Sequence, residues 1–86
     1  MTNKDYCGIV FIGGGSAWAW AGSPEDAAKA AAKQCRKDWG RYYDLKGKVK
    51  VNIYDMRKHE GWEADERGVV DSATGEPLKR HSVVEA

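Results

Sequence analysis

The feature that most constrains this chain is a helix whose buried side is predicted to be almost entirely alanine. Residues 24–39 are rich in strong helix formers, and small side chains recur every three to four residues. Ser23 and Pro24 predict the start of the helix, and Gly40 predicts its end. The buried stripe comprises Ala28, Ala31, Ala32, Cys35 and Trp39. Because alanines allow close approach, we expect the helix to pack on another surface of small side chains.

Two strands are predicted before the helix. Residues 6–12 are apolar on both faces, which is typical of a central or doubly covered strand. Residues 17–21 alternate, with alanines on one side and Trp18 and Trp20 on the other. The sequence at 13–16, Gly-Gly-Gly-Ser, predicts a turn because glycine accepts a positive φ. We therefore expect a hairpin whose alanine side receives the helix.

The segment after the helix predicts further strands. Residues 48–56 alternate, with valine and isoleucine inward and a polar side outward. The outward side comprises Lys48, Lys50, Asn52 and Tyr54. Residues 57–68 predict a loop or a short strand around Trp62. Val69 and Val70 predict a strand that enters a turn at 71–76 and returns over 77–84, where Pro77 indicates an edge strand.

This order of elements predicts the α+β class. We expect one antiparallel sheet of four to five strands with one helix on one face, in the order strand-strand-helix-strand-strand-strand. With 86 residues, the chain is expected to form a single small domain over 1–86. Trp18 and Trp20 would lie on the face opposite the helix. Either Trp62 and the C-terminal valines cover that face, or a partner or a second copy does.

The motifs that could carry chemistry are incomplete. The glycines at 13–15 follow a strand, as in a dinucleotide-binding fingerprint, but Trp18 occupies the third glycine position and the helix begins too late. His59 and His81 lack the spacing of a zinc site, and the acidic residues at 60–66 lack the spacing of an EF-hand. We therefore expect a non-enzymatic protein with no cofactor and no metal site.

Cysteine usage and the N-terminus bear on the compartment. Cys7 and Cys35 are too few for a disulfide scaffold, and they are expected either as free buried thiols or as one bridge between the first strand and the helix. The apolar stretch at 7–12 is shorter than the roughly 7–15 residues of a signal-peptide core and far too short for a membrane span. We expect an unprocessed N-terminus, a cytoplasmic protein and no membrane partner.

Charge is distributed unevenly, although the net charge is only +1. Residues 45–58 contain five basic side chains and one acidic, whereas residues 59–86 contain seven acidic and three basic. A basic strand with an aromatic ring can bind phosphates and stack a base. This candidate nucleic-acid surface comprises Lys46, Lys48, Lys50, Tyr54, Arg57 and Lys58.

The acidic block and the tryptophans predict a second kind of surface. Carboxylates on a small domain can imitate a phosphate backbone and occupy a basic groove on another protein. Exposed tryptophans would add an apolar patch. This candidate protein-binding set comprises Trp18, Trp20, Glu60, Trp62, Glu63, Asp65 and Glu66.

Residues 6–56, read as strand, glycine turn, strand, alanine-rich helix and strand, resemble small phage-encoded proteins, including several anti-CRISPR inhibitors. The Trp18-Ala19-Trp20 sequence before the helix is also similar to an uncharacterised bacterial domain. The first resemblance implies an inhibitor that occludes a nucleic-acid-binding surface on a host protein or nucleoprotein complex. Two alternatives stay open: a direct nucleic-acid-binding module, and a structural homodimer joined through the tryptophan face.

Overall fold

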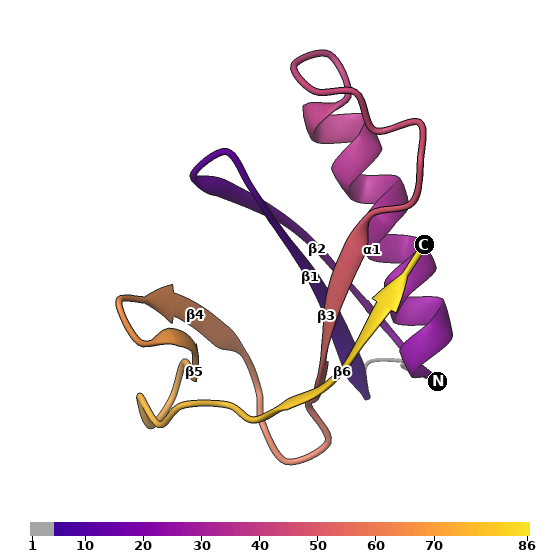
Figure 1. Ribbon diagram of the computed structural model, residues 1–86. Coiled ribbons are helices and arrows are strands. Elements are labelled where there is room, and N and C mark those ends of the chain that lie inside the picture. The colour runs from indigo at the N-terminus through magenta and orange to yellow at the C-terminus, as the bar shows by residue number, and fades with distance from the viewer. Residues whose placement is uncertain (1–4) are drawn as a thin grey trace.

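A computed structural model describes residues 5–86 and shows an α+β fold (Figure 1). Helix α1 packs on one face of an antiparallel sheet with strand order β2-β1-β3-β6, and a second sheet pairs β4 with β5. The elements are β1 (Tyr6–Ile12), β2 (Gly15–Ala21), α1 (Pro24–Trp39), β3 (Lys50–Asp55), β4 (Trp62–Asp65), β5 (Gly68–Asp71) and β6 (Arg80–Glu85). The predicted class and order are confirmed. Residues 1–4, on which the expectation of an unprocessed N-terminus partly depends, lie outside the described residues.

Helix α1 begins and ends where the sequence predicts. The Ser23 hydroxyl accepts a hydrogen bond from the Asp26 backbone N–H at 3.2 Å, and Pro24 occupies the first turn. The Gly40 N–H donates to the Arg36 carbonyl at 3.0 Å. The Arg36 guanidinium in turn donates to the carbonyls of Leu45, Gly47 and Ala86 at 2.9 Å each. One side chain therefore attaches both the loop after the helix and the C-terminus of the chain.

The alanine stripe packs on the small side chains of β1 and β2, as expected. Ala27, Ala28, Ala31, Ala32 and Cys35 are fully buried. They pack with Ala17 of β2, and Ala19 and Ala21 lie against the same cluster. Gly8 of β1 lies beneath the helix, where an added Cβ would be 2.6 Å from the Ala27 carbonyl oxygen. The helix is thus closer to β1 than any side chain at position 8 would permit.

A second cluster covers part of the opposite face of the sheet. It contains Cys7, Ile9, Tyr54, Met56 and Val69. Trp20, Trp62 and Leu78 pack against this cluster, so the expectation that Trp62 covers this face is confirmed. The expectation that the C-terminal valines cover this face is wrong, because Val84 packs with the helix-side core and Val83 is 43% exposed.

The predicted C-terminal hairpin is wrong in its pairing. β5 pairs with β4, whereas β6 pairs with β3 as the edge strand of the main sheet. The turn at 71–76 does form, with the Asp71 N–H donating to the Glu76 carbonyl, and a single bridge joins Val70 to Pro77. The ladder continues only to Leu78, whose N–H donates to the Val69 carbonyl at 2.9 Å, and burial of Val84 against the helix-side core favours pairing of β6 with β3.

The two cysteines are free thiols on opposite faces of the sheet. Cys35 belongs to the helix-side cluster and Cys7 to the second cluster, so the bridge considered from the sequence is wrong. Burial raises the pKa of the Cys7 thiol to about 12 and also raises that of Cys35. Both sulfurs are therefore protonated packing groups at neutral pH.

The Gly8→Ala substitution is expected to destabilise the fold by about 1–3 kcal/mol, as overpacking of a core does. The new Cβ would meet the Ala27 carbonyl oxygen and Val51 Cγ1 at 2.6 and 2.9 Å. Gly47→Ala is the matched control, because nothing lies within 4 Å of its Cβ position. Urea unfolding followed by tryptophan fluorescence measures both variants, and equal midpoints would contradict the close approach.

The thiols are expected to resist modification in the folded chain. Ellman's reagent at pH 8 should release little product until urea unfolds the protein, and then one equivalent for each of the two cysteines. Rapid reaction of either thiol without denaturant would contradict the burial of Cys7 and Cys35.

Candidate functional site

The acidic residues of the protein-binding set lie on β4 and its flanking loops. Glu60 precedes β4, Glu63 and Asp65 lie in it, and Glu66 follows it; all four are exposed. Asp65 accepts hydrogen bonds from Arg67, which hold the pKa of its carboxyl below the usual value. Within residues 5–86, Glu60, Glu63 and Glu66 have no ion-pair partner. Three carboxylates on and next to this short strand are thus free to meet external cations.

The tryptophans divide between core and surface. Trp20 is half-buried and packs against the second cluster, so it acts mainly in packing. Trp18 is 49% exposed and meets Trp62 edge to face, with ring centroids 6.2 Å apart. Strand alternation places Trp62 on the side of β4 that faces the sheet and Glu63 on the other side. An exposed aromatic ring therefore lies against the same short strand that carries the acidic set.

The predicted basic strand is not one surface. Lys46 and Lys48 precede β3, and Lys48 lines a depression with α1 residues, on the helix side of the sheet. Lys50 lies on the opposite face, beside Phe11 and Asn52. Tyr54 faces away from the helix as predicted, but it is only 8% exposed, so the expected stacking surface is wrong. The physical reason is that Met56, Val69 and Leu78 cover this end of the sheet.

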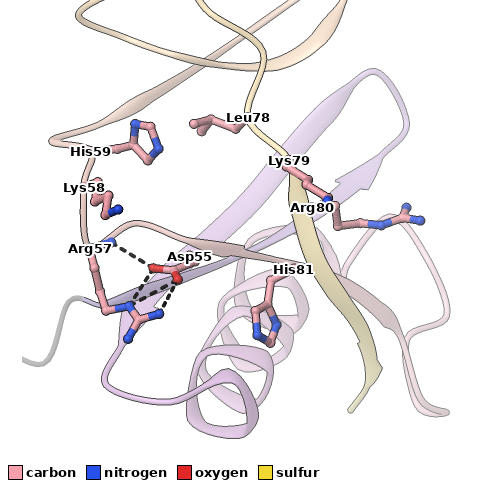
Figure 2. Close-up of a pocket in the computed structure, with 8 residues that line it drawn as sticks. All are labelled: Asp55, Arg57, Lys58, His59, Leu78, Lys79, Arg80 and His81. Atoms are coloured by element: carbon pink, nitrogen blue, oxygen red, sulfur yellow. Dashed lines mark hydrogen bonds and ion pairs between the residues drawn. The ribbon is translucent and has the colours of Figure 1, made fainter.

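Arg57 and Lys58 lie instead in a basic groove of about 520 Å³ between the end of β3 and the start of β6. Figure 2 shows Arg57 and Lys58 on one wall, and Lys79 and Arg80 on the other. The remaining lining residues are Asp55, His59, Leu78 and His81. Sequence reasoning missed the second wall because it paired residues 77–84 with β5. In the actual register, Tyr54 of β3 lies opposite Arg80 of β6. This pairing brings Lys79 and Arg80 to the second wall of the groove.

One ion pair dominates the first wall of the groove. The Arg57 guanidinium binds Asp55 with Nη2 2.6 Å from Oδ2, and these hydrogen bonds lower the pKa of Asp55 to about 2. Arg57 also lies 5.7 Å from the centroid of the Tyr6 ring, which meets the His81 ring edge to face. Arg57 is thus held and largely neutralised, whereas Lys58 and Lys79 have no ion-pair partner within residues 5–86.

A buried carboxylate anchors the loop that carries the groove. Asp71 is only 6% exposed, and its carboxylate is hydrogen-bonded to His59 Nδ1. It also accepts the backbone N–H groups of Ala73 and Thr74, at 2.7 and 3.2 Å. The His59 hydrogen bond, followed by these N–H groups, lowers the pKa of Asp71. This contact joins the groove loop to the end of β5.

The Asp71→Asn substitution is expected to destabilise the chain more at pH 7 than at pH 3. A lowered folded-state pKa means that the carboxylate stabilises the fold above its ordinary value of 3.8 and loses that effect as pH falls through the folded-state value. Urea unfolding at both pH values measures the difference, and Glu76→Gln on the same turn is the control. A destabilisation that is equal at pH 7 and pH 3 would contradict the role of this charge.

Within residues 5–86, no three His, Cys, Asp or Glu side chains are grouped in a way that could hold a metal ion. None of the helical structure in this range is long and apolar enough to cross a membrane. Comparisons with protein-family models, curated proteins and solved structures gave no match.

Proposed function

We propose that this chain is a non-catalytic inhibitor of the anti-CRISPR kind, encoded by a phage or mobile element and acting in the host cytoplasm. It would cover a nucleic-acid-binding surface on a host protein or nucleoprotein complex. The observation that carries this proposal is the set of unpaired carboxylates on and around β4, beside the half-exposed Trp18. We call Glu60, Glu63 and Glu66 the acidic face; Trp18 and Trp62 lie on the side of β4 that faces the sheet.

The charge of the acidic face fits a partner that normally binds phosphates. The two-stranded unit of β4 and β5 extends to one side of the main sheet (Figure 1), so its carboxylates can reach a concave surface. Like charges on one short element repel one another, and a cationic partner relieves that repulsion. The same complementarity accelerates association and orients the two proteins.

Trp18 would supply an apolar contact with the partner, in addition to the charge interactions of the carboxylates. Tryptophan is among the residues that contribute most to protein interfaces, especially when polar groups surround it. Trp62 supports one edge of the Trp18 ring and leaves about half of that side chain exposed. Burial of Trp18 on a partner would therefore add affinity to an interaction that charge has oriented.

The reversal of Glu63 and Glu66 to Lys tests the acidic face. Tagged wild-type chain should retain one protein complex from source lysate after nuclease treatment, and the double reversal should weaken that capture at least tenfold. Trp18→Ala should weaken it to a smaller extent. Lys29→Glu with Lys33→Glu is the matched control, because it reverses two exposed charges on α1 and should leave capture unchanged.

Activity on the captured complex separates inhibition from mere binding. The purified complex should lose affinity for its nucleic acid when wild-type chain is added, and keep that affinity when the double reversal is added. Unchanged capture by the double reversal, with wild-type circular dichroism, would refute the acidic face. A captured complex that binds nucleic acid equally well with the chain present would refute occlusion.

The homodimer alternative predicts a different result in solution. Light scattering should give the monomer mass of 9.5 kDa if the acidic face is reserved for another protein. A mass of twice that value, reduced to the monomer by Trp18→Ala, would instead assign the tryptophan face to self-association.

A further inference from the structure

We propose that a second surface, distinct from the acidic face, binds single-stranded nucleic acid. This basic track runs from the groove at the start of β6 to the depression beside Phe11. Its cations are Lys58, Lys79, Arg80 and Lys50. The phosphates would lie along these side chains, and a base would stack on the Phe11 ring.

The groove carries an excess of positive charge at neutral pH. Among the described residues that line it, four are Lys or Arg and one, Asp55, carries a carboxylate. Asp55 is already bound by Arg57, so it does not neutralise Lys58 or Lys79. Lysines without an internal partner are suited to phosphate oxygens. The basic groove therefore fits a phosphate-bearing ligand.

The cations continue beyond the groove, which favours a polymer over a single phosphate. Arg80 lines both the groove and the neighbouring depression, and in Figure 2 its side chain extends away from Asp55. The neighbouring depression contains Lys50 and Asn52, and Arg80 Nη1 is 3.5 Å from Asn52 Oδ1. Glu85, the one acidic residue there, is opposite Lys50 in the strand register but forms no ion pair within residues 5–86.

The exposed Phe11 ring indicates that the nucleic acid bound is single-stranded. The Phe11 side chain is 48% exposed and lies in the same depression as Lys50 and Asn52. Bases of a single strand can stack on an exposed aromatic ring, whereas the bases of a duplex are stacked on one another. A cationic track that ends at an aromatic ring is the arrangement found in proteins that bind single strands without base readout.

Fluorescence anisotropy of a labelled 20-nucleotide dT strand tests the basic track. Wild-type chain should bind at 50 mM salt, and Lys79→Glu with Arg80→Glu should reduce the affinity at least tenfold. Three to four phosphate contacts predict a slope of log K against log salt of about −2 to −3, at roughly −0.7 per contact. The Lys29→Glu, Lys33→Glu variant should bind as wild type does.

Two single substitutions distinguish the contribution of charge to the affinity from the contribution of base stacking. Asp55→Asn should raise the affinity several-fold, because it frees the Arg57 guanidinium while its side-chain oxygen can still accept the Arg57 backbone N–H. Phe11→Ala should lower the affinity several-fold without changing the salt slope. Thermal melts by circular dichroism confirm that both variants fold.

Several outcomes would overturn the basic track. These are no binding at 50 mM salt, unchanged binding after reversal of Lys79 and Arg80, equal affinity for a duplex of the same length, and displacement of the strand by a few millimolar inorganic phosphate. The Glu63→Lys, Glu66→Lys variant should still bind the dT strand. Failure of this proposal is thereby distinguishable from failure of the acidic face.

Discussion

The structure depends on how closely α1 approaches β1. At Gly8 there is no room for a side chain beneath the Ala27 carbonyl, and the buried residues that α1 itself contributes are four alanines and Cys35. The small side chains of β2 face the helix, whereas Trp18, Trp20 and Tyr54 lie on the opposite face of the sheet. That face then needs its own cover, which β4, β5 and Leu78 supply for Cys7, Ile9 and Tyr54. This cover leaves Trp18 and Phe11 about half exposed.

The incomplete covering of this sheet face by β4, β5 and Leu78 explains where binding surfaces can occur. The acidic face lies on the outer side of the covering strands, and the basic track forms where β6 joins β3. A net charge of +1 thus conceals two surfaces of opposite charge on one small chain. Such a division suits a protein that meets both the protein and the nucleic-acid parts of one complex.

Local patterns in the sequence were sufficient to predict much of the fold. The caps at Ser23 and Gly40, the alternation of residues 17–21 and the turn glycines each depend on neighbouring residues, and all were predicted correctly. The partner of β6 was not, because pairing between β3 and β6 depends on burial of Val84 far from the turn that precedes it. Because of the same error, Lys79 and Arg80 were not among the predicted site residues. Tyr54 was misjudged because no local pattern reveals that Met56 and Val69 cover it.

Hydrogen–deuterium exchange on the captured complex tests whether the partly covered sheet face and the covering strands, rather than the helix, form the interface. Binding should slow exchange at β4, β5 and residues 17–20, and leave the exposed side of α1 unchanged. Protection confined to α1, with β4 and β5 exchanging as in the free chain, would contradict an interface on the covering strands.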